Sequence, residues 1–158
     1  MHADERITEN FTLQELIASD IATRNSLDNT PGEGEVQHLR RLTVDILQWI
    51  RDKLDSPVIV TSGYRSRDVN AMAGGDRHSA HIDGRAADIK VFGLRPGDVA
   101  LWMASSKIPF DKLILEFGAW CHVQVPKYGR APRCATYTAV KLEGRTVYLE
   151  GLRPQVFR

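Results

Sequence analysis

Two histidines and one aspartate stand where the chain can gather them around a divalent metal ion. His81 and Asp88 lie in the segment "SAHIDGRAADIK", and His122 lies in "WCHVQV". His81 precedes a turn-forming glycine, Gly84, and Asp88 lies on the strand that leaves this turn, so the chain can fold back and bring the two side chains together. Two imidazoles and one carboxylate suit a divalent metal, and three protein ligands leave a fourth position for water, as in a catalytic zinc site.

Strand geometry sorts the residues around His122. Successive side chains of a strand alternate between its two faces, so Trp120, His122 and Gln124 share one face while Cys121 points to the other. We therefore expect Cys121 to be a small buried apolar residue rather than a ligand. Trp120 either packs in the core or walls the substrate cleft, and the sequence leaves both roles open.

Three further polar residues are placed to act on a substrate. Glu116 precedes His122 by six residues across a turn at Gly118, and this turn can return its carboxylate to the site as the general base of a hydrolysis, a role worth roughly 10²–10⁴ in rate. Arg65 in "TSGYRS" follows a buried strand, where its guanidinium can bind a substrate carboxylate or stabilise an oxyanion. Ser79 can present its hydroxyl to the same substrate.

The surrounding elements follow from periodicity and from turn residues. Thr12 and Glu15 have capping-box spacing and predict a short helix, and apolar residues at helical spacing predict a long helix over residues 35–54. Helices are also expected near residues 66–73 and 95–106. Strands are predicted at "PVIVTSG", "RAADIKVF", "DKLILEF" and "WCHVQV", and "TYTAVKLEGRTVYLEG" predicts a hairpin that turns at Glu143 and Gly144. This order favours an α+β domain with helices on one face of a small, mainly antiparallel sheet.

Composition narrows the classes of partner. The 158 residues carry 21 Lys and Arg against 20 Asp and Glu, so no global field attracts nucleic acid or an anionic membrane. Apolar runs are too short for a membrane helix, and the polar segment "MHADERITEN" has no secretory signal. We therefore expect cytoplasmic synthesis and no membrane insertion. We also expect a monomer, with Cys121 and Cys134 as free thiols.

Three motifs together resemble a known family. "SGYRS", "SAHIDGRAAD" and "EFGAWCH" are similar to the motifs of the zinc D-alanyl-D-alanine carboxypeptidases. That family includes phage L-alanyl-D-glutamate endopeptidase endolysins and shares its metal-site fold with the hedgehog signalling domain. The similarity covers about residues 11–133 of an expected single peptidase domain, 1–158, which leaves a C-terminal hairpin and tail at 134–158.

The resemblance implies a role for each matching residue. It makes His81, Asp88 and His122 the ligands of one catalytic Zn²⁺, Glu116 the base, and Arg65 and Ser79 substrate contacts. Many relatives place the base three residues before the last histidine, where this chain has Ala119, so only the variant with the longer interval fits.

The function that the resemblance implies is hydrolysis of a peptide bond in bacterial cell-wall stem peptides or cross-links. D-Ala-D-Ala carboxypeptidase, L-Ala-D-Glu endopeptidase and D-Ala-diaminopimelate endopeptidase activities all remain open. A phage or prophage endolysin that reaches the wall after release fits the expected cytoplasmic synthesis, and a virion-associated enzyme is an alternative.

Two other functions compete with a hydrolase. An Fe(II) oxygenase binds its metal through a facial triad of two histidines and one carboxylate, and His81, Asp83 and His122 match this pattern. Those enzymes need an eight-stranded jelly-roll barrel, however, and the predicted helices leave too little chain for one. A non-catalytic zinc-containing binding module of the same fold is the second alternative, and retention of Glu116 argues against it. His78 is a rival ligand whose place in "GGDRH" favours the rim of the site.

Overall fold

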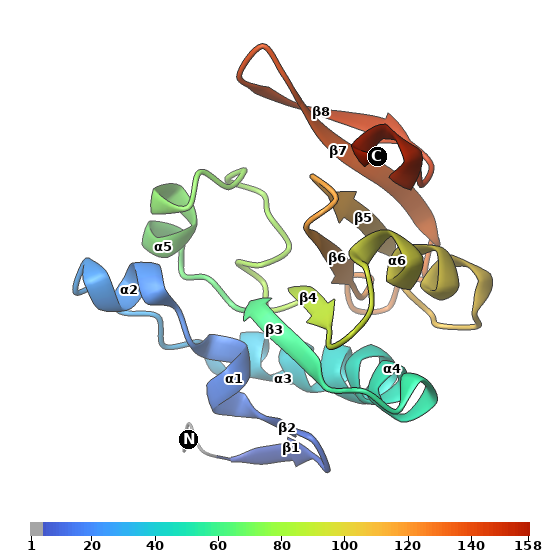
Figure 1. The fold of residues 1–158 in the computed structure, drawn as a ribbon. Coiled ribbons are helices and arrows are strands. Elements are labelled where there is room, and N and C mark those ends of the chain that lie inside the picture. Colours follow the sequence, from blue (N-terminus) through green and yellow to red (C-terminus); the bar gives the residue numbers. More distant parts are fainter. Residues whose placement is uncertain (1–4) are drawn as a thin grey trace.

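A mixed six-stranded sheet organises the chain. The computed structural model describes residues 5–158, and Figure 1 shows the sheet with its helices. The strand order is β3-β4-β6-β5-β7-β8, and every neighbouring pair is antiparallel except β5 and β7, which are parallel. The strands span Val58–Ser62 (β3), Ala86–Val91 (β4), Lys112–Glu116 (β5), Trp120–Gln124 (β6), Ala135–Leu142 (β7) and Arg145–Glu150 (β8). A separate small sheet pairs β1, Arg6–Thr8, with β2, Phe11–Thr12.

The helices are mostly short. They span Leu13–Ile17 (α1), Asp20–Arg24 (α2), Glu33–Leu42 (α3), Gln48–Leu54 (α4), Arg67–Met72 (α5) and Pro96–Ser105 (α6), with a 3-10 turn at Pro154–Phe157. The predicted capping box is confirmed, because the Thr12 side chain accepts from the backbone of Glu15 and the Glu15 carboxylate accepts from the Thr12 N–H. In residues 5–158 we find no helix with the length and apolar content needed to cross a membrane.

The core lies between one face of the sheet and the helices that cover it. Leu113, Leu115, Cys121 and Val123 project from β5 and β6 into this core, together with Ala87 and Ile89 of β4. Helix α6 contacts β4, β5 and β6, and Trp102 of α6 stacks on Trp49 of α4 with ring centroids 5.7 Å apart. The structure therefore has the α+β class that the sequence predicts, with a mixed sheet and helices packed against its core face.

Two features differ from the predicted elements. The expected continuous helix over residues 35–54 is interrupted by a π-helical turn at Thr43–Leu47. There the Thr43 hydroxyl donates to the carbonyl of Leu39 at 2.7 Å, a side-chain bond that competes with the backbone ladder and loosens it. The C-terminal hairpin turns at Glu143 and Gly144 as predicted, both with positive φ, but it joins the sheet through the parallel pairing of β7 with β5.

Candidate metal centre

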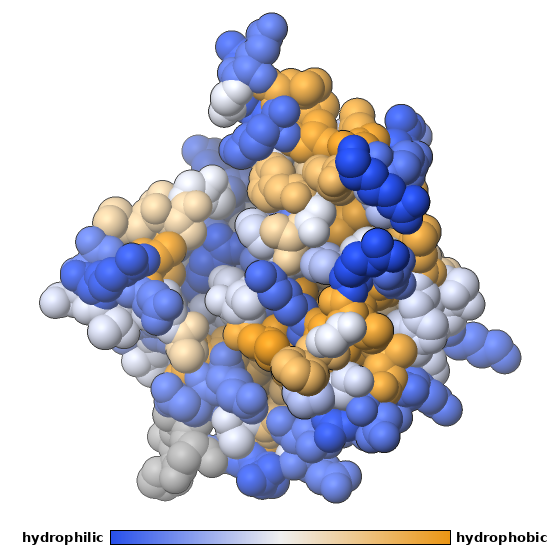
Figure 2. Space-filling model, in the orientation of Figure 1, coloured by the Kyte–Doolittle hydropathy of each residue, from blue (hydrophilic) through white to orange (hydrophobic). Residues whose placement is uncertain are grey.

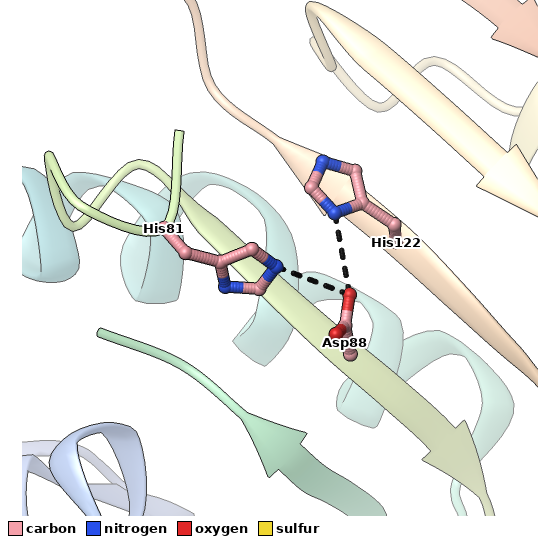
Figure 3. Close-up of side chains that lie close together, drawn as sticks. All are labelled: His81, Asp88 and His122. Carbon is pink, nitrogen blue, oxygen red and sulfur yellow. Dashed lines mark hydrogen bonds and ion pairs between the residues drawn. The ribbon is translucent and has the colours of Figure 1, made fainter. Parts of the chain in front are cut away.

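Three buried side chains converge on the face of the sheet opposite the core. Asp88 of β4 and His122 of β6 are direct partners in the antiparallel register, so both project from the same face. His81 comes from the turn before β4, where Gly84 has a positive φ. Figure 3 shows both imidazole rings directed at the Asp88 carboxylate. The three predicted ligands therefore lie together, with one ligand atom of each within 4.8 Å of the others.

The ring orientation of His81 is fixed by a backbone carbonyl. His81 Nδ1 lies 2.7 Å from the carbonyl oxygen of Gly63, which can only accept, so Nδ1 carries the proton. This leaves a lone pair on Nε2, which lies 3.3 Å from Asp88 Oδ1 and is buried without any hydrogen-bond partner. Fixing one ring nitrogen by a hydrogen bond is how proteins present the other nitrogen to a metal.

Gln124 orients His122 in the same way. His122 Nε2 lies 2.8 Å from Gln124 Oε1 and donates to it, while Nδ1 lies 3.2 Å from Asp88 Oδ1. Gln124 follows His122 by two residues on β6, so strand alternation places both side chains on one face.

The three acceptors require a cation between them. If both rings are neutral, two nitrogen lone pairs face one carboxylate oxygen, which is repulsive unless a proton or a metal ion lies there. Zinc ligands at about 2.0–2.2 Å from a tetrahedral ion lie about 3.3–3.6 Å apart, close to the spacing of Asp88 Oδ1 from each histidine. The donor set, its spacing and the orphaned His81 nitrogen all fit Zn²⁺.

The ionisation states agree with a cation site. Burial lowers the pKa of His81, and the attraction of Asp88 offsets this only in part, so that ring is neutral. Burial acts to lower the pKa of His122 as well, but its hydrogen bonds to Asp88 and Gln124 and the negative charges of Asp88 and Glu116 together outweigh burial and raise this pKa. For Asp88, burial raises the pKa while the two histidines lower it by more, well below its usual range.

Glu116 lies beside the predicted ligands, as its predicted role requires. Its Oε1 atom is 3.7 Å from His122 Nδ1, and it reaches this position because Phe117 and Gly118 both take positive φ in the turn after β5. Burial raises the pKa of Glu116 to about 7, and the negative charge of Asp88 adds to this. A cation bound at Asp88 would oppose the second effect.

Arg65 approaches the centre from the loop after β3. Its Nη2 atom is 3.9 Å from Asp88 Oδ2, and its buried Nε has no hydrogen-bond partner. Burial lowers the pKa of this guanidinium, opposed by the charges of Asp88 and Glu116. The side chain therefore has donor capacity left for a ligand.

An open cleft of about 810 Å³ leads to these residues. Ser79 and Trp120 both line it, which places Trp120 at the cleft wall, in edge contact with Phe117. The Ser79 hydroxyl accepts from the backbone N–H of His81 at 3.2 Å, so it also fixes the turn that carries this ligand. His78 lines the exposed rim and is not part of the cluster.

Asp83 and the cysteines lie away from the cluster. The Asp83 side chain is 45 % exposed and accepts from Arg85 Nε at 3.1 Å, so it does not join His81 and His122 in a facial triad. The six-stranded sheet is also not the barrel that an oxygenase of that class needs. Cys121 is buried in the core, and both it and Cys134 are free thiols, as expected.

Replacing Gly63 with Ala should disturb the centre and the fold together. A Cβ at this position would lie 2.2 Å from the backbone oxygen of Leu16, so the strand end that carries the Gly63 carbonyl must shift. We expect a loss of about 1–3 kcal/mol in the free energy of unfolding, with weaker metal binding. Urea denaturation and zinc titration would measure both. Gly34→Ala is the matched control: it meets nothing within 4 Å on α3 and should stabilise by about 0.4–1 kcal/mol.

Gln124→Leu should weaken metal binding without removing a ligand. The substitution keeps the volume but leaves the Nε2–H of His122 without its acceptor, and loss of such a partner costs roughly 10–100-fold in metal affinity. Competitive titration against a zinc chelator would measure this change. Gln37, an exposed residue of α3, provides the control, and Gln37→Leu should leave the zinc affinity unchanged. Equal zinc affinities in the two variants would contradict the orienting role of Gln124.

Comparison with known proteins adds one family match. The family model described as Peptidase M15 matches residues 9–124, well over half of the chain. The matched segment contains every residue of the cluster, together with Arg65, Ser79 and Glu116. No curated protein gives a significant match to the chain.

Proposed function

Because the chain belongs to the peptidase M15 family, a family of zinc metallopeptidases, we propose that it hydrolyses a peptide bond in the stem peptides or cross-links of bacterial cell wall. His81, Asp88 and His122 would hold one Zn²⁺. The observation that carries this proposal is a three-ligand cluster beside a half-buried carboxylate, Glu116, inside an open cleft.

The positions of the side chains suggest a separate role in the hydrolysis for the metal ion and for Glu116. When bound, Zn²⁺ would lower the pKa of a coordinated water to about 7 and would polarise the scissile carbonyl. Glu116 takes the proton from the attacking water and passes it to the leaving amine. A base is most effective when its pKa lies near the working pH, and burial raises the pKa of Glu116 to about 7.

Arg65 and Ser79 act on the substrate rather than on the proton. Arg65 has an unpartnered Nε–H, and its position next to Asp88 allows it to stabilise negative charge that develops on the carbonyl oxygen. Ser79 lines the same cleft and holds the His81 turn through its hydroxyl. Trp120 closes one side of the cleft next to Glu116, its register partner on β5.

We propose an endolysin role for this activity. Carboxypeptidase cleavage of D-Ala-D-Ala and endopeptidase cleavage of L-Ala-D-Glu or D-Ala-diaminopimelate bonds use the same set of groups, so the shape of the cleft selects among them. A non-catalytic binding module is the less favoured function, because a module without catalysis has no need for the Glu116 carboxylate beside the metal ligands.

Mass spectrometry of purified muropeptides tests the proposal. After incubation with zinc-loaded protein, we expect products that sum to the substrate plus one water and are split at a single bond, which also identifies that bond. Intact muropeptides, both monomeric and cross-linked, from a protein that holds one zinc ion would contradict the proposed activity.

A further inference from the structure

The C-terminal hairpin forms a wall of the cleft although it lies outside the segment that matches the family. Tyr137, Lys141, Thr146 and Tyr148 of β7 and β8 line the cleft, whereas the family match ends at residue 124. On the face seen in Figure 2, hydrophobic residues gather over the region of this hairpin. This wall is therefore where the chain can add recognition of its own to a shared metal centre.

The face of the sheet that lines the cleft continues from the metal cluster to the hairpin. His122 pairs with Ile114, and Ile114 pairs with Tyr137, so these side chains form one row across β6, β5 and β7. In the next row Ala139 lies between Glu116 and Tyr148. Burial raises the pKa of the Tyr148 hydroxyl, and the charge of Glu116 adds to this, as expected if Tyr148 faces the site.

Lys112 is a half-buried cation on this face. It precedes Ile114 by two residues on β5, so it lies on the same face, about 6.6 Å along the strand from the row that contains His122. Its Nζ atom is 5.8 Å from the ring centroid of Tyr137. Within residues 5–158 its ammonium has no carboxylate within 4.0 Å and no hydrogen bond.

The other cations on the Lys112 side of the cleft are already engaged, whereas Arg65, which keeps a free Nε–H, lies beside Asp88 at the metal cluster. Arg133 is bound by Asp111 at 2.7 and 2.9 Å, and Arg85 donates to Asp83 and to the carbonyl of Val125. Lys141 donates to Thr146 Oγ1 at 2.9 Å near the hairpin tip. Lys112 is thus the cleft cation whose three N–H donors remain free for a ligand.

We propose that Lys112 and Tyr137 form a subsite that binds a carboxylate group of the peptide substrate. This inference rests on the proposed function, since it assigns the subsite to the same cleft. The ammonium supplies a charge-assisted hydrogen bond, and the aromatic ring holds the lysine over the cleft floor. The distance along β5 places the carboxylate about two residues of extended chain from the scissile bond, and D-glutamate and diaminopimelate both carry such a group.

Matched peptides that differ in one group test the subsite. A stem-peptide series is prepared with each free carboxylate converted in turn to the carboxamide, and kcat/KM is measured for the wild type, Lys112→Met and Lys112→Arg. We expect amidation of one particular carboxylate to lower the wild-type kcat/KM about tenfold, the lower end for a hydrogen bond to a charged group. This preference should vanish in Lys112→Met and largely persist in Lys112→Arg.

A control variant and a binding measurement separate the possible failures. Lys90→Met changes an exposed strand lysine that does not line the cleft and should keep the preference. If the peptides are cleaved but Lys112→Met keeps the preference, the subsite is wrong and the proposed function stands. If no peptide is cleaved, the proposed function is wrong, and the subsite is then tested by calorimetry with the same peptides. In that case the subsite stands only if wild type binds the carboxylate form more tightly than Lys112→Met does.

Discussion

Glu116→Gln should lower kcat by roughly 10²–10⁴-fold while the protein keeps its zinc, because the substitution removes the base and leaves the three ligands in place. The amide has nearly the same shape as the carboxylate and cannot accept the proton from the attacking water. The carboxylate lies 3.7 Å from His122 Nδ1 and is not part of the cluster that could hold a metal. Turnover of a muropeptide and zinc content per chain would be measured on the same preparation.

The control for this variant is a carboxylate far from the cleft. Glu9→Gln changes an exposed residue of the N-terminal segment and should leave both kcat and zinc content unchanged. A Glu116→Gln protein with full zinc content and wild-type turnover would mean that another group is the base. Loss of zinc in Glu116→Gln would instead make Glu116 a ligand.

Asp88→Asn should abolish stoichiometric zinc binding, whereas Asp83→Asn should not. Asp88 Oδ1 is the atom that both histidine nitrogens approach, and its loss removes the one negative charge of the donor set. We expect the affinity to fall by more than the roughly 10–100-fold that follows loss of an orienting partner. Metal analysis after dialysis and circular dichroism would show whether the folded protein has lost its zinc.

Asp83→Asn is matched in chemistry and lies five residues away in the same motif. Its side chain pairs with Arg85 on the outside of the turn, so zinc binding and turnover should stay near wild type. The opposite result, zinc kept in Asp88→Asn and lost in Asp83→Asn, would restore the facial triad that the sequence also permits.

Much of the centre was predictable because it depends on short-range geometry. Alternation along β6 puts His122 and Cys121 on opposite faces, and in the structure His122 lies beside His81 and Asp88 while Cys121 is buried in the core. The turn at Gly84 brings His81 back over β4, as its position in the sequence indicates. In each case the relevant partner lies within a few residues or on a strand whose face the pattern fixes.

The partners that orient the ligands leave a weaker signal in the sequence. The carbonyl of Gly63 holds His81 across 18 residues, and a backbone oxygen carries no signal in the sequence. Strand alternation predicts that Gln124 shares a face with His122, but the hydrogen bond between them depends on side-chain rotamers. The parallel pairing of β7 with β5 escaped prediction for a different reason: hydrophobic periodicity identifies a strand but not its neighbour. That pairing is what brings Tyr137 into the cleft.

We propose that His81, Asp88 and His122 together hold one zinc ion. Crystals of the zinc-loaded protein, with diffraction measured on both sides of the zinc absorption edge, test it most directly. We predict one anomalous peak bounded by His81 Nε2, Asp88 Oδ1 and His122 Nδ1, within the cleft that Glu116 lines. A peak elsewhere on the chain, or no peak from a protein shown to contain one zinc ion per chain, would show that these three residues do not form the zinc site.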